Sequence, residues 1–139
     1  MNIYFYQVGP TELNEYWPKV EGRLQKACDV TGFFDTSDIY HDLIDKRLML
    51  VVGVDENYNI VGEAIYRRVI YPKKKSLVLV ISSAISFKEF FPHIYEYSFD
   101  LLAQIRFDVL EVLCRPAVAR MLRKKGHKPY YWMIAHGRR

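Results

Sequence analysis

The stretch Ser76–Lys125 constrains the fold most, because it predicts a strand, a helix, a strand and a second helix in that order. Leu77–Ile81 is an unbroken run of Leu, Val and Ile, which is typical of a strand buried on both faces. Val109–Cys114 is a second such run, interrupted only by Glu111. Between the two runs, Pro92–Arg106 carries apolar residues at helical spacing. Two buried strands joined by a helix predict a right-handed parallel crossover, with any ligand at the carboxyl end of the first strand.

The rest of the chain predicts helices and strands on both sides of this unit. The expected elements are strand Asn2–Val8, a helix from Trp17 to Gly32 with Pro18 near its start, helix Thr36–Lys46, strands Leu48–Val54 and Ile60–Tyr71, helix Ala117–Lys125 and strand Tyr130–Ala135. The order is therefore β-α-α-β-β-β-α-β-α-β. It predicts an α/β (α+β) fold in which a mixed sheet of about six strands carries helices on both faces.

Length and composition predict one soluble domain. The chain has 139 residues, half of them hydrophobic, which suits a single core. No apolar run approaches the roughly 20 residues of a membrane span, and the N-terminus lacks the pattern of a signal peptide. We therefore expect a cytoplasmic protein without membrane contact. Cys28 and Cys114 lie in apolar patterns, and no Cys or His spacing is that of a metal site, so we expect neither disulfide nor metal.

The charge of the chain is unevenly distributed. Glu111 is the last acidic residue, whereas eight of the 20 Lys and Arg residues follow it. Such polarity indicates one basic face. Two interpretations remain open: a solvated rim, or a surface that binds the phosphates of a nucleotide, a nucleic acid or a cofactor.

The element order, at this length, resembles the GNAT fold of acyl-CoA N-acyltransferases. Three segments carry the resemblance. Asn59–Gly62 is similar to the turn and start of the family's third strand, and Leu110-Glu111-Val112 is similar to a Leu-Glu-Val in the fifth strand of ribosomal-protein-type members. Arg115–His127 resembles Asn-x-x-Ala-x-x-x-Tyr-x-Lys-x-Gly-Phe through Val118, Lys124 and Gly126. The resemblance implies acetyl-CoA as the cofactor.

The chain also departs from the family's pattern at positions that carry chemistry. The family grips the cofactor's diphosphate with Gln/Arg-x-x-Gly-x-Gly/Ala, because glycines let backbone N–H groups approach phosphate at a helix N-terminus. The corresponding stretch here, Ser82–Phe90, contains no glycine. Arg115 stands at the family's Asn, and Leu122 stands at the Tyr that acts as general acid. A leucine cannot donate a proton to a leaving thiolate.

Two carboxylates are the catalytic candidates. In family members with Leu-Glu-Val, the glutamate is the general base, so the resemblance implies that role for Glu111; the alternative is a strand residue that faces solvent or pairs with an arginine. Glu63 follows Gly62 on its strand and either lines the cleft or pairs with a lysine or arginine on a neighbouring strand.

Five residues are the cofactor-binding candidates. The resemblance implies that the backbone around Ile81, Ser82 and Ser83 pairs with the pantetheine arm of the cofactor. The hydroxyls of Ser82, Ser83 and Ser86 either donate hydrogen bonds to phosphate or belong to an ordinary polar loop. Arg115, beside the last predicted helix, either binds phosphate or belongs to a solvated basic helix end.

The departures from the pattern resemble a group of small bacteriophage GNAT-like proteins, in which an arginine follows the fifth strand and the phosphate loop is degenerate. This second resemblance implies a non-catalytic virion, assembly or host-interaction protein, with phage or host proteins as partners and the host cytoplasm or the virion as its location. Two alternatives remain: an active acetyl-CoA-dependent N-acetyltransferase with Glu111 as general base, and a nucleic-acid-binding module that uses the basic carboxyl end.

Overall fold

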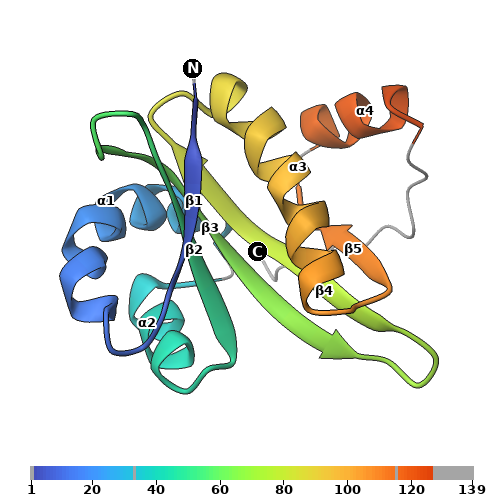
Figure 1. Cartoon of the computed structure of the whole chain (residues 1–139), viewed down its shortest axis with the longest axis horizontal. Helices are drawn as coiled ribbons and strands as arrows, with labels where there is room; N and C mark the ends of the chain where they lie inside the picture. Colours follow the sequence, from blue (N-terminus) through green and yellow to red (C-terminus); the bar gives the residue numbers. More distant parts are fainter. Residues whose placement is uncertain (1, 33, 115, 127–139) are drawn as a thin grey trace, which may run out of the picture.

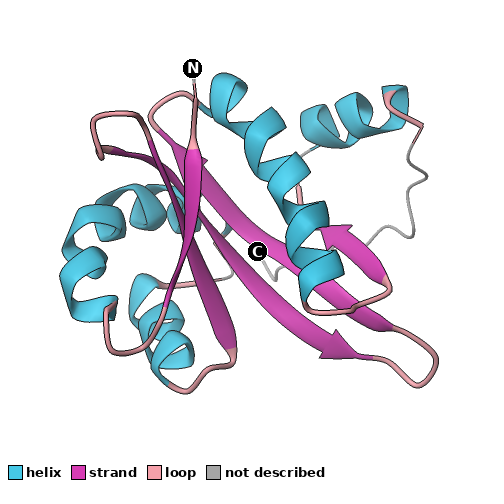
Figure 2. Ribbon diagram, in the orientation of Figure 1, coloured by secondary structure: helices cyan, strands magenta, loops and turns pink. Residues whose placement is uncertain are grey.

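A computed structural model describes residues 2–32, 34–114 and 116–126 of the chain as a sheet with helices on both faces (Figures 1 and 2). The elements, in chain order, are β1 (Tyr4–Val8), α1 (Leu13–Thr31), α2 (Thr36–Ile44), β2 (Leu48–Val54), β3 (Ile60–Ile70), β4 (Lys75–Ala84), α3 (Phe87–Gln104), β5 (Val109–Val112) and α4 (Pro116–Lys124). This order confirms the predicted α/β fold. The final strand expected at Tyr130–Ala135 lies outside the described residues.

The sheet has five strands in the order β1-β2-β3-β4-β5 within the described residues. The first three pairings are antiparallel, and β4 and β5 are parallel. The parallel crossover predicted for the second half of the chain is therefore confirmed. Strand β2 has the predicted bounds, and β3 ends one residue earlier than expected.

Two apolar cores lie on the two faces of the sheet. On one face, α1 and α2 bury Leu24, Cys28 and Ile39 against Leu50 and Ile65 of the sheet. On the other face, α3 and α4 cover a second core, which contains Tyr66, Leu77, Leu79, Phe90, Ile94 and Leu101. Figure 1 shows the two helix pairs on opposite sides of the strands. The fully buried runs of β2 and β4 follow from this arrangement, since both faces are covered.

Both long helices begin earlier than predicted. We expected α1 to start near Pro18 and α3 to start at Pro92, but each proline is the sixth residue of its helix. Leu13 extends the apolar stripe of α1 by one turn and is buried, which holds the early turn in place. In α3, Phe90 and Phe91 do the same. Buried apolar side chains therefore outweigh the backbone hydrogen bond that each proline cannot make.

The N-terminal half of α3 is seated on two glycines. Gly53 of β2 and Gly62 of β3 are register partners, and the Phe90 ring lies directly over both. A Cβ atom built on Gly62 would lie 2.5 Å from the Phe90 Cε1 atom, and one on Gly53 would lie 2.7 Å from it. The Phe5 ring meets the Phe90 ring edge-on, with centroids 5.8 Å apart. The missing side chains thus let the helix approach the sheet closely.

The pairing of β4 with β3 shifts by one residue at a β-bulge in β4. Ile65 is paired with Ile81, but Tyr66 is paired with Leu79, so Val80 is an extra residue. As a result Val80 and Ile81 both pack into the core beneath α1 and α2. The β4–β5 ladder extends only from Ser76 to Leu79, whereas β4 continues to Ala84. The last part of β4 therefore has no β5 partner.

Candidate functional site

The expected site lies where β4 ends and α3 begins, and the connection there is very short. Ala84 is the last residue of β4 and Phe87 the first of α3, so only Ile85 and Ser86 join them. The Ile85 amide is bonded to the Val61 carbonyl at 2.9 Å, which ties the junction to β3. Ile85 and Phe87 expose 71% and 39% of their surface. The surface at this junction is therefore apolar, and only two residues lead from the strand into the helix.

A buried carboxylate lies beside the same end of the sheet. Glu63 of β3 is completely buried, and Arg23 of α1 donates to it through Nε at 3.1 Å and Nη2 at 2.9 Å. The Ser83 hydroxyl donates to the second carboxylate oxygen at 2.7 Å. Arg23 also reaches the Ile60 carbonyl at 3.4 Å. Glu63 therefore pairs with an arginine, as one alternative predicted, but this arginine comes from α1 rather than from a neighbouring strand.

The electrostatics of Glu63 combine opposing effects. Burial raises the pKa of its carboxyl group above the ordinary value, while the hydrogen bonds from Arg23 and Ser83 oppose that rise. Because Arg23 is only 26% exposed, the pair is held largely away from water. With both oxygens engaged, the carboxylate is satisfied within the fold and presents no free oxygen to a substrate amine.

The three candidate serines differ in their hydrogen bonds and exposure. The Ser82 hydroxyl donates to the Glu63 carbonyl at 3.2 Å, and the Ser83 hydroxyl donates to the Glu63 carboxylate. Each hydroxyl has one hydrogen, so neither offers one to a phosphate in this arrangement. Ser86 is the exposed N-cap of α3 and makes no capping bond with its side chain. The side chain of Ile81 is buried in the core, which leaves only its backbone for a ligand.

The other catalytic candidate, Glu111, lies elsewhere. Its carboxylate accepts a hydrogen bond of 2.6 Å from the hydroxyl of Ser76, which is fully buried at the start of β4. Glu111 is in register with Val78, whereas Glu63 is in register with Ser83. At about 3.3 Å per residue, those positions are roughly 16 Å apart along β4. The two carboxylates therefore do not belong to one reacting centre.

Helix α4 carries the position where the family has its general acid. Leu122 is half-buried there, and it packs with Val118 and Met121 against the core beneath α3. Its side chain has an ordinary packing role. Arg115, the remaining cofactor-binding candidate, lies outside the described residues.

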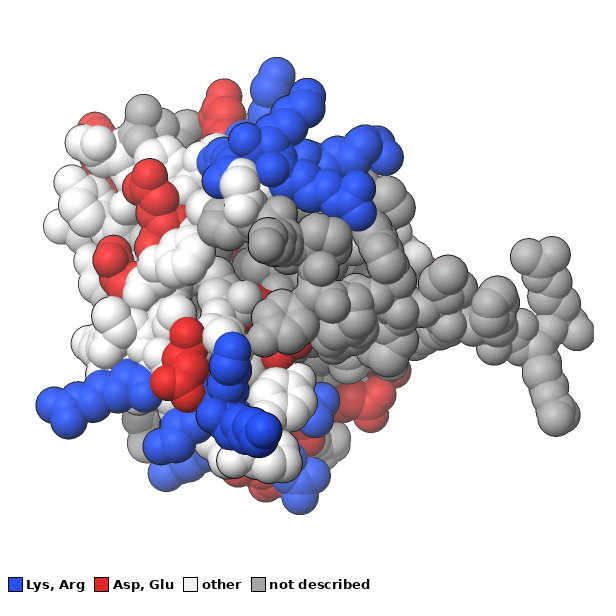
Figure 3. All heavy atoms as spheres, turned by 90° about the vertical axis from the view of Figure 1, so that its right-hand side faces the viewer, with Lys and Arg blue, Asp and Glu red and all other residues white. Residues whose placement is uncertain are grey.

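The exposed side of α4 is basic. Arg120, Arg123, Lys124 and Lys125 are all exposed, and Figure 3 shows basic side chains gathered at the level of this helix. The Lys125 Nζ atom lies 5.2 Å from the centre of the Tyr95 ring of α3. Two of these cations, Arg123 and Lys124, occupy the last turn of α4, where the helix dipole favours positive charge.

Within the described ranges, no group of three His, Cys, Asp or Glu side chains could hold a metal ion. The same residues contain no helix long and apolar enough to cross a membrane. Neither Cys28, which is buried, nor Cys114, which is exposed, forms a disulfide within the described residues.

Arg23 is the residue of this region that sequence reasoning missed. It precedes Leu24, a member of the buried stripe of α1, so it lies at the edge of that stripe. An arginine beside an apolar stripe, together with a carboxylate in a buried strand, is the signal that could have suggested the pair. Forty residues separate the two in sequence, so only the fold brings them together.

Comparison with known proteins gives a uniform result for the fold. No protein-family model and no curated protein sequence matches the chain. Among solved structures, a ribosomal-protein-alanine N-acetyltransferase from Brucella melitensis biovar Abortus 2308 is similar, with a TM-score of 0.74, 12% identity and 99% of each chain covered. An aminoglycoside acetyltransferase from an uncultured soil metagenomic sample, in complex with sisomicin, has a TM-score of 0.68 at 11% identity, covering 99% of this chain and 95% of that one.

A third similar structure is an integron cassette protein from the mobile metagenome of V. cholerae, with a TM-score of 0.65, 12% identity, and coverage of 97% of this chain and 94% of that one. Similarity at this level of identity shows the fold. The chain has the GNAT fold, as the element order predicted, and structures of acetyltransferases share it.

Proposed function

We propose that this chain is an acetyltransferase-like protein that keeps the GNAT scaffold without efficient acetyl transfer, and that it acts by binding a protein partner. The observation that carries the proposal is the junction between β4 and α3. Two residues, neither of them glycine, connect the strand to the helix, and apolar side chains are exposed at the place where a diphosphate would sit. A dianion at this junction would meet only the first-turn N–H groups of α3, without a glycine loop whose backbone could surround it.

The nearby polar groups support the same proposal. The hydroxyls of Ser82 and Ser83 and both oxygens of Glu63 are engaged with one another or with Arg23. Leu122 offers no proton to a leaving thiolate. Most of the described candidates for binding phosphate or moving protons are thus missing or engaged within the fold, and Ser86 at the exposed start of α3 is the exception.

The biological role follows from the second sequence resemblance rather than from the fold. We propose a virion, assembly or host-interaction role in a bacteriophage, with phage or host proteins as partners. A stoichiometric place in purified particles, or co-purification with one host protein, is the expected finding. Absence of the chain from both would remove this role.

A second candidate function is active N-acetylation with Glu111 as general base, and one observation favours it. Strands β4 and β5 stop pairing after Leu79, so among the described residues the last part of β4 has no strand partner on that edge, and a pantetheine arm could form backbone hydrogen bonds along it. Holding an amine and a thioester together can itself accelerate transfer. This candidate therefore depends on the cofactor being bound at all.

Acetyl-CoA binding separates the two candidates. A ligand present at about 100 times its Kd stabilises the native state by about 2.7 kcal/mol, which raises the melting temperature of a chain of this size by roughly 10 °C. We expect almost no shift at millimolar acetyl-CoA, and no release of free thiol with a panel of amines.

A clear shift together with saturable thiol release would overturn the proposal in favour of the enzyme. In that case Glu111→Gln should lower kcat by about a hundredfold or more. The matched change Glu96→Gln, at an exposed position on α3, should leave kcat unchanged.

A further inference from the structure

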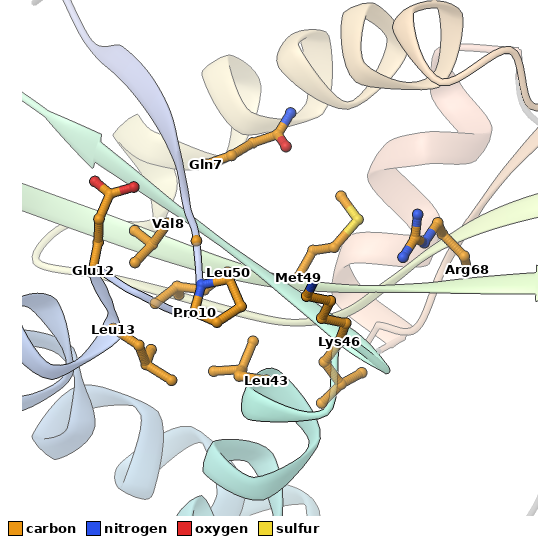
Figure 4. Close-up of a pocket in the computed structure, with 12 residues that line it drawn as sticks. Gln7, Val8, Pro10, Glu12, Leu13, Leu43, Lys46, Met49, Leu50 and Arg68 are labelled. Carbon is orange, nitrogen blue, oxygen red and sulfur yellow. The ribbon is translucent and has the colours of Figure 1, made fainter.

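A pocket lies at the end of the sheet opposite the junction of β4 and α3 (Figure 4). Gly62, at the start of β3, pairs with Ala84, whereas Arg68, which lines the pocket, pairs with Leu77 near the start of β4. The pocket exists because β1 ends at Val8, opposite Leu50, while β2 extends two residues further to Leu48. Its volume is about 370 Å³, within the range of small-molecule sites.

The floor of the pocket is apolar. Leu13, Leu43 and Leu50 line it on the face under α1 and α2, where they are buried, and Met49 lines it on the opposite face. These four residues come from the start of α1, the end of α2 and the start of β2, each of which is anchored in a core, and Pro10 adds to the lining from the connection between β1 and α1. A preformed apolar surface of this kind favours a ligand with a hydrocarbon body.

The charged groups of the pocket are separated. Figure 4 shows Glu12 on one side, with Lys46 and Arg68 on the other. Glu12 is the N-cap of α1, and Lys46 follows the C-terminal end of α2, so each charge opposes the partial charge of its own helix end. Arg68 comes from a strand and makes no ion pair within residues 2–32, 34–114 and 116–126. Lys46 makes no ion pair in that range either, so this side of the pocket carries two positive charges without an ion-pair partner there.

Lys46 is held in an unusual backbone conformation. Its φ is 61°, in the left-handed region that glycine or asparagine usually occupies after a helix. Backbone bonds from Lys46 to the Leu43 carbonyl at 3.2 Å and from Arg47 to the Asp42 carbonyl at 2.8 Å fix this turn. A lysine there costs about 1 kcal/mol, and the turn places its side chain at the pocket.

We propose that this pocket binds a small monocarboxylate with an unbranched apolar body. The carboxylate lies against the Arg68 guanidinium, whose planar fork suits two parallel hydrogen bonds, with Lys46 beside it. The hydrocarbon part lies over Met49, which is on the same face of the sheet as Arg68, and crosses the edge of β2 beyond the end of β1 to reach Leu43 on the other face. Glu12 at the far side disfavours a second acidic group on the ligand.

The test uses hexanoate as the probe, titrated into the isotope-labelled full chain at low salt and followed by amide chemical shifts. We expect saturable shifts at the amides of Leu43 and Met49. Two matched compounds test the charge arrangement: hexylamine, which has the same hydrocarbon but a positive end, and adipate, which adds a second carboxylate. Both should bind at least about tenfold more weakly than hexanoate.

Two neighbouring arginines on β3 provide matched variants. Arg68→Gln should weaken hexanoate binding about tenfold, and Arg68→Lys should restore part of it. Arg67→Gln, next to it on the strand but not part of the pocket lining, should leave binding unchanged. Equal binding of hexanoate and hexylamine, equal effects of Arg67→Gln and Arg68→Gln, or no saturable shift at the pocket amides would each overturn the proposal. The outcome does not depend on acetyl-CoA binding.

Discussion

The contact between α3 and the paired glycines predicts a severe effect of a single methyl group. In Gly62→Ala the new Cβ would lie 2.5, 2.6 and 2.7 Å from three atoms of the Phe90 ring, distances that real Cβ atoms do not show. The ring is 2% exposed and is backed by Phe5, so it cannot move aside freely. Overpacking of a closed core costs 1–3 kcal/mol, and we expect about 3 kcal/mol here because three contacts are violated together.

The assay is urea unfolding followed by circular dichroism. The midpoint should fall with little change in m, since the exposed surface is unchanged. Gly22→Ala is the matched control, because Gly22 is an exposed position in α1 with nothing within 4 Å of a new Cβ. It should stabilise the chain by about 0.5–1 kcal/mol.

A double-mutant cycle then tests the cause. With Phe90→Ala in place, the methyl group of Gly62→Ala enters empty space, so its cost should vanish and the coupling energy should be about 3 kcal/mol. If Gly62→Ala were as harmless as Gly22→Ala, or as costly with Phe90 removed as with it present, the close approach of α3 to the sheet would be refuted.

Three further predictions concern polar groups. Arg23→Leu should lower the free energy of unfolding, measured in urea, by about 3 kcal/mol at pH 7, because it leaves the buried Glu63 carboxylate unpaired. The loss should be smaller near pH 4, where the carboxyl group is protonated, and equal losses at both pH values would contradict this. Burial raises the pKa of Tyr66 above its ordinary value of 10.0, so the protonated hydroxyl contributes fully to the free energy of unfolding below pH 10, and this contribution is lost as the pH rises further. The Tyr66→Phe variant should therefore lose less stability at alkaline pH than the unchanged chain, and an equal loss would exclude Tyr66 as its source. Asp55→Ala should cost about 1 kcal/mol, since the Asp55 carboxylate accepts hydrogen bonds from two turn amides at 2.9 and 3.0 Å, and no change in the unfolding midpoint would show that these bonds contribute nothing.

Strands and turns were predictable because their signals are local. The bounds of β2 follow from an apolar run that ends at the Asp55–Asn59 turn, and both features are visible within a few residues. Helix starts were less predictable, because a proline in a helical pattern indicates the first turn of a helix. In both long helices, tertiary burial of residues ahead of Pro18 and Pro92 decided the boundary.

The site was predictable only in part. The absence of glycine between β4 and α3 is readable from sequence, and the two-residue junction agrees with it. The partners of Glu63 were not predictable, because Arg23 is 40 residues away and the register of Ser83 depends on the bulge at Val80. Similarly, the bond between Ser76 and Glu111 depends on the parallel pairing of β4 with β5.

The division of the apolar interior by the sheet has a consequence for how such a chain changes over time. In the described part of the chain, no buried residue belongs to both cores. Substitutions that do not touch one another have nearly additive effects on stability. A lineage can therefore accumulate replacements under α3 and α4, next to the β4–α3 junction, while the layer under α1 and α2 keeps the polypeptide folded. Extensive change beside the β4–α3 junction and retention of the fold are then compatible within a single small protein.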